Sequence, residues 1–285
     1  MKGIWITGAG GQLGIELQKK LARRKRVLAT DAELDICNAA AVEGFIAANG
    51  IGTIVNCAAY TNVEAAEDDA ERCFAVNATG VKTLAEAALK TDAALIQIST
   101  DYVFDGNRRT PYRESDTPAP LNVYGARKLE GERAMIKSGC RGVSVRTAWL
   151  YSPFGKNFMK TMATLGSQRD VVNVVCDQIG CPTAADSLAG AIVRIIDNIG
   201  NRRGEIYHYT GCGETSWSVF AAAIMHCAGN SCRVVDIKSD GYPQKATRPA
   251  YSYLDCSKIK HDFGIETEPW QSALERNMRR YKRLL

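Results

Sequence analysis

The sequence predicts an α/β protein, and three observations support this fold class. Strand-like and helix-like periodicities alternate through the first half of the chain, and the strand-like runs lack a polar face. A glycine-rich turn also joins the first such strand to the first helix. Strands without a polar face are typical of a parallel sheet that helices cover on both sides. We therefore predict a Rossmann-like, doubly wound parallel sheet with a smaller C-terminal α/β lobe.

The elements of the sheet follow from local patterns, in order along the chain. Buried strands are expected at residues 3–7, 26–30, 53–57, 94–99 and 142–147. Helices are expected between them at residues 12–23, 38–49, 69–90 and 123–138. The first helix places Leu13, Leu17 and Leu21 on one face, and Asn38 is a suitable N-cap for the second. Residues 105–122 are rich in Pro, Gly, Asp and Asn, which predicts an exposed loop.

The pattern becomes more mixed after Tyr151. Helices are expected near residues 158–165, 187–198, 216–228 and 269–280, with short strands near 171–175 and 205–209. We therefore place a domain boundary near Tyr151, which gives a first domain of residues 1–150 and a second lobe of residues 151–285, whose segments can interleave. Open α/β sheets bind ligands at the carboxyl ends of their strands, so we expect the second lobe to lie over that edge.

The composition excludes several broad classes of protein. The chain has 285 residues, of which 46% are hydrophobic, and no apolar run approaches the roughly 20 residues of a membrane-spanning helix. Its first residues lead directly into a strand and lack the pattern of a secretory signal, so we expect a cytoplasmic protein with no membrane partner. Ten cysteines without a Cys-x-x-Cys pair, and three separated histidines, predict packing residues rather than disulfides or a metal site.

Two basic clusters, at residues 23–26 and 279–283, contribute to a net charge of +5. A nucleic-acid-binding patch and a pair of solvated helix ends both fit such clusters. Cations stabilise the C-terminal end of a helix, which favours the second interpretation. We therefore expect no nucleic-acid partner.

The turn after the first strand has glycines at positions 8, 11 and 14. Gly8 permits a tight turn, Gly11 allows the backbone to approach a pyrophosphate, and Gly14 lets the helix pack against the sheet. The helix N-terminus then offers free N–H groups and a positive dipole to phosphates. A plain strand-to-helix turn would show the same glycines, so a second signal is needed.

Asp31 supplies this second signal for a dinucleotide site. It follows the second strand, 17 residues after Gly14, close to where dinucleotide folds have an acid for the adenosine ribose. Its carboxylate accepts hydrogen bonds from a ribose 2′-OH but repels a 2′-phosphate, which favours NADH over NADPH. Arg24 and Arg26 lie nearby in the sequence and would offset the repulsion, so both cofactors remain open.

Tyr124 and Lys128 are four residues apart on one predicted helix and therefore share a face. A free phenol has a pKa of about 10, and a nearby ammonium group would stabilise its phenolate. Thr100 ends the preceding strand, so its hydroxyl and the Tyr124 phenol would polarise and protonate one carbonyl oxygen as hydride arrives. The alternative is that Tyr124 and Lys128 are an ordinary pair of surface residues. Their position after the strand that ends at Thr100 favours ketone reduction instead.

Further motifs extend these patterns over nearly the whole chain. In sequence order they are Gly8-Ala9-Gly10-Gly11-Gln12-Leu13-Gly14, Leu34-Asp35-Ile36, Asn56-Cys57-Ala58-Ala59-Tyr60-Thr61, Ser99-Thr100-Asp101-Tyr102-Val103-Phe104-Asp105-Gly106, Pro120-Leu121-Asn122-Val123-Tyr124-Gly125, Arg146-Thr147-Ala148-Trp149-Leu150-Tyr151, Asn157-Phe158 and Asp177-Gln178-Ile179-Gly180-Cys181-Pro182-Thr183. With these motifs the chain resembles the extended short-chain dehydrogenase/reductases, and within them the enzymes that reduce a C4 ketone of a nucleotide-linked sugar.

The resemblance implies roles for individual residues. The catalytic set would be Thr100, Tyr124 and Lys128. The substrate contacts would be Thr100, Asp101, Trp149 and Arg248, the last by bidentate binding of a diphosphate. The dinucleotide contacts would be Gly8, Gly11, Gln12, Leu13, Gly14, Asp31, Asp35, Ile36, Ala58, Ala59, Tyr60, Thr61, Tyr124 and Lys128. A packed core aromatic is the alternative for Trp149, and a surface arginine is the alternative for Arg248.

The reaction implied by the resemblance is the reduction of dTDP-4-dehydro-L-rhamnose to dTDP-L-rhamnose by NADPH or NADH, with Tyr124 as the proton donor. Residues 1–150 would then bind the dinucleotide, and residues 151–285 mainly the nucleotide sugar. A 4-epimerase or 4,6-dehydratase of nucleotide sugars would share the fold, but dehydratases have Thr-Asp-Glu where this chain has Thr100-Asp101-Tyr102. A non-enzymatic regulatory subunit of the methionine adenosyltransferase type is a third interpretation.

The resemblance leaves the metal requirement and the oligomeric state open. Some family members are dimers that bind Mg²⁺ through glutamates, one of them on the first helix. Glu16 lies at the corresponding place, but the sequence offers no convincing partner carboxylate. We therefore predict no metal ion, and either a monomer or a homodimer.

Overall fold

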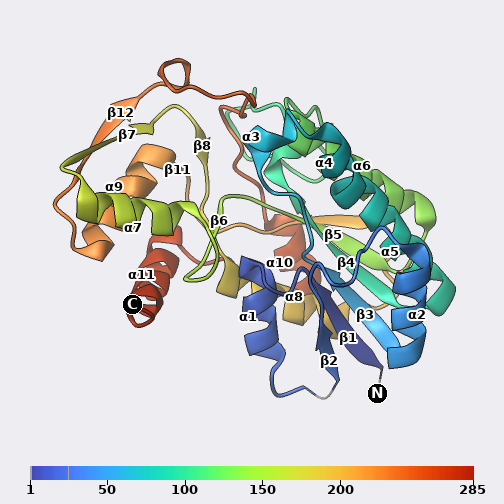
Figure 1. Cartoon of the computed structure of the whole chain (residues 1–285). Helices are drawn as coiled ribbons and strands as arrows, with labels where there is room; N and C mark the ends of the chain where they lie inside the picture. Colours follow the sequence, from blue (N-terminus) through green and yellow to red (C-terminus); the bar gives the residue numbers. More distant parts are fainter. Residues whose placement is uncertain (1, 25) are drawn as a thin grey trace.

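A six-stranded parallel sheet forms the centre of the fold (Figure 1). The computed structural model describes residues 2–24 and 26–285; Met1 and Lys25, the latter in the first basic cluster, lie outside them. The strand order is β10-β5-β4-β3-β1-β2. Because this order reverses between β1 and β3, the binding crevice of an open sheet is expected there. The strands are β1 Gly3–Thr7, β2 Val27–Ala29, β3 Ile51–Asn56, β4 Ala94–Thr100, β5 Gly142–Thr147 and β10 Glu205–His208.

Helices cover both faces of this sheet, as the strands without a polar face predicted. Alternate side chains of β1 point to opposite faces, so Ile6 packs with the helices of one layer and Trp5 with those of the other. The first layer holds α1 Gln12–Leu21, α8 Ala185–Asn198 and α10 Ser257–Phe263. The second holds α2 Ala39–Asn49, α5 Gly80–Thr91 and α6 Val123–Ser138. Within residues 2–24 and 26–285, no helix is long and apolar enough to cross a membrane.

Helix α6 has the bounds that the sequence predicted, because both of its ends carry local signals. The side chain of Asn122 accepts a hydrogen bond from the backbone N–H of Gly125 at the start of the helix. Gly139 ends it in the left-handed region, with φ of +69°. Asn38 caps α2 in the same way, by accepting from the N–H of Ala41.

The long helix expected at residues 69–90 is confirmed as a continuous helical segment, but it contains a π-helical turn that the sequence did not predict. The segment consists of α4 Ala70–Phe74, the π-helical turn η1 Ala75–Thr79 and α5. Asn77 within the π-helical turn exchanges two hydrogen bonds with the backbone of Tyr60, of 3.0 and 2.9 Å. Tyr60 and Asn77 are 17 residues apart in the sequence, so these hydrogen bonds leave no local pattern. The periodicity of the helix therefore did not reveal the π-helical turn. Two short helices lie near the strand ends, α3 Val63–Ala66 and the 3₁₀-helix η2 Asp101–Val103.

The C-terminal lobe has its own core of Met, Val and aromatic side chains. Its helices are α7 Phe158–Gln168, α9 Trp217–Ala228 and α11 Trp270–Lys282, and a 3₁₀ turn, η3, spans Ser239–Gly241. Its strands pair as β6 Leu150–Tyr151 with β9 Thr183–Ala184, β8 Ile179–Gly180 with β11 Thr215–Ser216, and β7 Val171–Val175 with β12 Arg233–Ile237. The chain after Tyr151 also returns to the large sheet, where it supplies β10, α8 and α10 (Figure 1).

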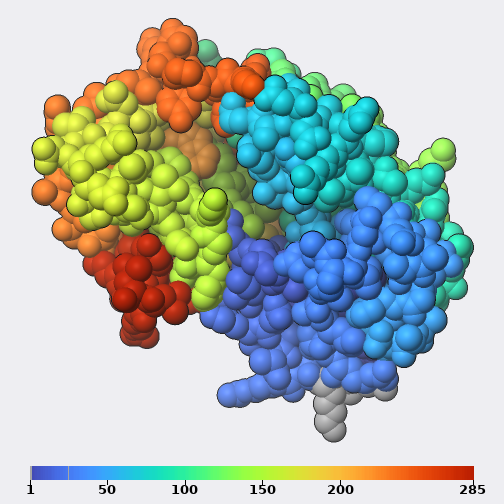
Figure 2. All heavy atoms as spheres, viewed as in Figure 1, coloured from blue at the N-terminus to red at the C-terminus, as the bar shows by residue number. Residues whose placement is uncertain are grey.

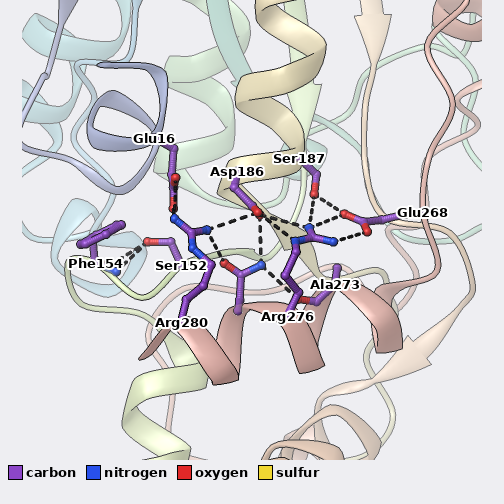
Figure 3. Close-up of polar contacts among 10 residues, drawn as sticks. Glu16, Ser152, Phe154, Asp186, Ser187, Glu268, Ala273, Arg276 and Arg280 are labelled. Atoms are coloured by element: carbon purple, nitrogen blue, oxygen red, sulfur yellow. Dashed lines mark hydrogen bonds and ion pairs between the residues drawn. The ribbon is translucent and has the colours of Figure 1, made fainter. Parts of the chain in front are cut away.

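A network of charged side chains joins α11 to the large sheet and its helices (Figure 3). Glu16 on α1 is 2% exposed, and its two carboxylate oxygens accept hydrogen bonds of 2.7 and 2.9 Å from Arg280 on α11. Asp186 on α8 lies 3.0 Å from Arg276 and 3.2 Å from Arg280. Glu268 also binds Arg276. This arginine network therefore ties the last helix of the lobe to the first helix of the chain.

We predict that replacing Arg280 by Met lowers the free energy of unfolding by about 2–4 kcal/mol, because the buried Glu16 carboxylate loses its cation. The matched control is Arg279→Met on the same helix. Both members of the pair between Arg279 and Glu275 are exposed, so that change is expected to stay within about 0.5 kcal/mol. Urea denaturation measures both variants, and equal losses in the two would contradict this role of Arg280.

Candidate active site

A deep cleft lies between the two lobes, along the carboxyl ends of the sheet strands. Figure 2 shows the hollow between the yellow and orange C-terminal lobe and the blue and cyan N-terminal residues. Its volume is about 1020 Å³, at the upper end of the sizes usual for ligand sites. The C-terminal lobe contributes Gly155, Lys156, Asn157 and Trp217 to its lining. Both lobes therefore contribute to this cleft.

The glycine loop forms one wall of the cleft. Gly8 has φ of +60°, and a Cβ there would lie 2.6 Å from the backbone N of Ala58, so the turn requires glycine. A Cβ on Gly14 would lie 2.5 Å from the carbonyl oxygen of Gly8, so its absence lets α1 begin close to β1. The N-cap of α1 is Gly11, which has no side chain to cap the helix. The first N–H groups of α1 are therefore available to an anion in the cleft.

Asp31 follows β2 and lies against the glycine loop. Its Oδ2 atom accepts a hydrogen bond of 2.8 Å from the backbone N–H of Gly10. The two arginines that we expected to offset its charge bind elsewhere. Arg24 donates to a carboxylate on α8 at 2.6 Å, and Arg26 donates to a backbone carbonyl at the end of α2 at 2.7 Å. Asp31 therefore presents its negative charge to the cleft without compensation from either arginine.

The hydroxyl of Thr100 stands at the end of β4 and is held by two hydrogen bonds. It accepts one of 3.2 Å from the backbone N–H of Tyr102 and donates one of 3.0 Å to Oδ1 of Asp101. Thr100 is paired in register with Thr147 on β5. The residues that follow Thr147 therefore reach the cleft beside Thr100.

Helix α6 approaches Thr100 closely because position 125 is glycine. A Cβ on Gly125 would lie 2.1 Å from the carbonyl oxygen of Tyr102. The ring of Tyr124 meets the ring of Tyr102 edge-on, with centroids 5.9 Å apart. Thr100, Tyr124 and Lys128 all line the cleft. The three residues predicted as a catalytic set thus lie along one wall.

Burial changes the acidity of both functional side chains of α6. It raises the pKa of the Tyr124 phenol. It lowers the pKa of Lys128 to about 8, and the negative charge of Glu132, one turn further along α6, opposes this fall. The Nζ atom of Lys128 donates a hydrogen bond of 2.6 Å to the carbonyl oxygen of Ile98. In this structure the ammonium group therefore binds β4, whereas we expected it to act on the phenol.

Asp101 is the buried acid of the cleft, with 2% of the residue exposed. Burial raises the pKa of Asp101 to about 7, against the opposing effect of the hydroxyls of Ser252 and Thr100. Its Oδ2 atom has no partner in hydrogen-bond geometry among the described residues. A carboxyl group with this pKa is able to donate as well as accept hydrogen bonds near neutral pH.

Trp149 lines the cleft and has a backbone conformation that bulky residues rarely adopt. Its φ is +47°, in the left-handed region. Its indole stacks on Trp217 from the start of α9, with ring centroids 3.7 Å apart and an angle of 12°. A Cβ on Gly180 would lie 2.8 Å from the indole, so glycine leaves room for it. Strain of this kind is often retained at functional sites.

Most of the residues predicted from the sequence line the cleft, but two do not. Tyr60 is absent from the lining, and Arg248 lies 2.6 Å from Glu64 in an ion pair. Two lining residues of the C-terminal lobe, Lys156 and Trp217, were not selected from the sequence. Asn157, which also lines the cleft, appeared in a motif but was given no role. The predicted residues in the lining are Gly8, Gly11, Gln12, Leu13, Gly14, Asp31, Asp35, Ile36, Ala58, Ala59, Thr61, Thr100, Asp101, Tyr124, Lys128 and Trp149.

Glu16, the position that the resemblance connected with a metal ion, lies in the arginine network described above (Figure 3). Both of its carboxylate oxygens accept hydrogen bonds from Arg280. In the part of the chain that the structure describes, no group of three or more His, Cys, Asp or Glu residues is arranged to hold a metal ion. A guanidinium group therefore neutralises this carboxylate here.

Comparison with known proteins gives consistent similarities over the whole chain. The model of the family described as "RmlD substrate binding domain" matches residues 1–283. A curated relative from Aggregatibacter actinomycetemcomitans, named dTDP-4-dehydrorhamnose reductase, is 42% identical, and the alignment covers 99% of each chain.

Two solved structures are similar in both fold and sequence. A dTDP-4-dehydrorhamnose reductase from Clostridium acetobutylicum has a TM-score of 0.95 and 39% identity, and the match covers 99% of this chain and 100% of that one. A protein of the same name from Bacillus anthracis, in complex with NADP, has a TM-score of 0.93 and 36% identity, over 98% and 100% of the two chains.

We predict that Gly125→Ala destabilises the protein by about 1–3 kcal/mol, because the new methyl group overlaps the carbonyl oxygen of Tyr102 and forces the start of α6 away from β4. The matched control is Gly44→Ala within α2. A Cβ at that position meets nothing within 4 Å, so the change is expected to stabilise the protein by about 0.5–1 kcal/mol. Denaturant unfolding measures both variants. The change in the free energy of unfolding is expected to be negative for Gly125→Ala and positive for Gly44→Ala.

Proposed function

The chain belongs to the RmlD substrate binding domain family, and on this basis we propose that it is a dTDP-4-dehydrorhamnose reductase that uses NADH or NADPH. The observation that carries the proposal is the cleft itself. One wall holds the glycine loop, and the same cleft holds Thr100, Tyr124 and Lys128 at the carboxyl edge of the sheet. A reductase needs these two parts to meet, because hydride and proton reach neighbouring atoms of one carbonyl group.

The residues of the glycine loop fit a dinucleotide. The missing Cβ atoms of Gly8 and Gly14 and the uncapped N–H groups of α1 form a cradle for a pyrophosphate. Asp31 is placed to accept from the hydroxyls of the adenosine ribose. When bound, the reduced nicotinamide would supply a hydride to C4 of the sugar.

We assign the proton to Tyr124. As C4 accepts the hydride, its oxygen takes the phenolic proton, so that the ketone becomes a secondary alcohol and one proton is consumed per turnover. Lys128, as an ammonium group, would stabilise the phenolate that remains, and it has to leave or share its bond to Ile98 to do so. Thr100 would donate to the same oxygen. In the structure the Thr100 hydroxyl donates its proton to Asp101. Protonation of Asp101 would weaken this hydrogen bond and leave the hydroxyl free to donate to the substrate.

The residue after Asp101 favours reduction over the elimination of water. A 4,6-dehydratase has a glutamate there to eliminate water, whereas this chain has Tyr102. Incubation with dTDP-4-dehydrorhamnose therefore ought to consume NADH absorbance in proportion to product. A 4-epimerase would leave that absorbance unchanged over turnover, and a non-enzymatic subunit would leave the sugar unchanged.

We predict that Tyr124→Phe lowers kcat by about 10²–10⁴-fold, because it removes the proton donor and leaves the shape of the cleft. The loss of NADH absorbance with the 4-keto sugar measures this change. Tyr242→Phe, at an exposed tyrosine of the C-terminal lobe, is the control and ought to retain full activity. A Tyr124→Phe enzyme with normal kcat would remove Tyr124 from the mechanism.

We predict a preference for NADH over NADPH, because the carboxylate of Asp31 lies at the glycine loop, where we propose that the adenosine ribose binds, and both nearby arginines bind elsewhere. Asp31→Asn keeps an acceptor for the N–H of Gly10 and removes the charge. The ratio of kcat/KM for NADH to that for NADPH ought to fall by about tenfold, which corresponds to about 1.4 kcal/mol. An enzyme that prefers NADPH before the substitution would contradict the prediction.

A further inference from the structure

Behind the cleft, three polar side chains form a buried cluster that the proposed reaction does not use. Glu132 on α6 and Arg146 on β5 are each 1% exposed, and His208 on β10 is fully buried. Burial of an ion pair is costly unless good hydrogen bonds replace the lost water. We therefore looked for a role that explains why an ion pair is buried here, beside the edge strand β10.

The geometry of the cluster is complete. The Nε and Nη2 atoms of Arg146 donate to the two carboxylate oxygens of Glu132 at 2.9 and 2.7 Å, which is the strong bidentate arrangement. The Nη1 atom of Arg146 lies 3.4 Å from Nε2 of His208, whose Nδ1 atom lies 3.1 Å from the carbonyl oxygen of Tyr112. Burial lowers the pKa of His208 to about 3, with the nearby Arg146 adding to this effect, so the imidazole is neutral and accepts from Arg146.

The cluster binds the elements that carry the proposed catalytic residues to one another. Glu132 follows Tyr124 and Lys128 at intervals of four residues, so the three share one face of α6. Arg146 is paired in register with Ser99, the residue before Thr100, and with His208 on β10. The ion pair between Glu132 and Arg146 therefore fixes the lateral position of α6 against the strands that end at the cleft.

The charge of Glu132 also reaches Lys128. The groups that act on the Lys128 amine are the carboxylate of Glu132 from α6, the thiols of Cys57 and Cys73, and the carbonyl of Ile98. Burial raises the pKa of Cys57 to about 12 and also raises the pKa of Cys73, so both thiols are neutral near pH 7. Glu132 is therefore the carboxylate whose charge opposes the loss of the Lys128 proton.

We propose that Glu132 and Arg146 are positioning residues for Lys128: the pair holds α6 in place and keeps a carboxylate one turn from the amine, so that the amine stays an ammonium group within a water-poor cleft. Arg146 orients the carboxylate through its two hydrogen bonds. The role in the reaction rests on the function proposed above, whereas the effect on the amine does not.

The first test is Glu132→Gln, which keeps the shape of the side chain and removes its charge. Because the carboxylate raises the pKa of Lys128, its loss moves that pKa below about 8. The alkaline fall of kcat/KM ought then to move to lower pH by about one unit, while KM for the nucleotide sugar stays unchanged. A purely structural role would lower stability and leave the pH profile where it is.

The matched control lies on the same helix. Glu130 accepts hydrogen bonds of 2.9 and 3.0 Å from Arg127, and its side chain is 38% exposed. Glu130→Gln ought to leave both kcat and the pH profile unchanged. An equal shift of the pH profile in Glu130→Gln and Glu132→Gln would overturn the inference.

A second variant covers the case in which Glu132→Gln does not fold. The double substitution Glu132→Leu and Arg146→Met removes both charges together, and such replacements usually preserve a fold. We expect a folded protein whose alkaline fall is again displaced to lower pH and whose kcat at neutral pH is reduced about tenfold. A folded double variant with the parental kcat and pH profile would overturn the inference.

The amine of Lys128 is also to be measured without turnover. Trace acetylation by acetic anhydride over a range of pH, read at Lys128 by mass spectrometry, reports the fraction of free amine. In Glu132→Gln the midpoint ought to fall by the same amount as in the activity profile. If the parent protein fails to reduce the sugar, the proposed function fails, and this acetylation curve still decides the inference: an unchanged midpoint overturns it.

Discussion

The contact between α1 and the C-terminal lobe is the interaction on which the cleft depends. The first turn of α1 carries Gly11 and Gly14 of the glycine loop, and Glu16 in the next turn is bound by Arg280 on α11. Leu17 on the same helix packs into the core of the sheet. A ten-residue helix thus holds one wall of the cleft, the sheet and the far lobe at once.

Helix α6 determines the other half of the geometry, and glycine makes its approach possible at two points. A Cβ on Gly125 would overlap the carbonyl of Tyr102, and one on Gly131 would lie 2.2 Å from the carbonyl oxygen of Asn77. Asn77 lies in the π-helical turn and holds the backbone of Tyr60 through its side chain. This close contact therefore positions both α6 and the loop that follows β3. Tyr60 itself is absent from the lining of the cleft, so this contact holds the loop in place without bringing Tyr60 to the site.

The sheet and α6 were predictable because their signals are local. Apolar runs without a polar face mark the strands, and Asn122 and Gly139 mark the ends of α6. The two-residue strands of the lobe could not be predicted, because their partners come from distant segments of the chain. Ile179, for example, pairs with Ser216 on one side and with Tyr251 on the other.

The same distinction applies to the candidate site. Thr100 and Tyr124 stand at element ends that the sequence indicates. The place of Trp217 depends on a stack with Trp149, and that of Arg248 on an ion pair with Glu64. No local pattern contains either contact.

Burial gives the cleft its acids and bases. It raises the pKa of Asp101 to about 7 and lowers the pKa of Lys128 to about 8, so two residue types that normally titrate far apart come close to neutrality. The same exclusion of water that produces these shifts would also discharge Lys128 if nothing opposed it. A compensating carboxylate has to be buried as well, and it needs its own cation to remain ionised there. Glu132 and Arg146 satisfy both requirements, since the pair faces Lys128 with its negative end. The protonation state of Lys128, which lines the cleft, thus depends on the buried pair of Glu132 and Arg146 behind it.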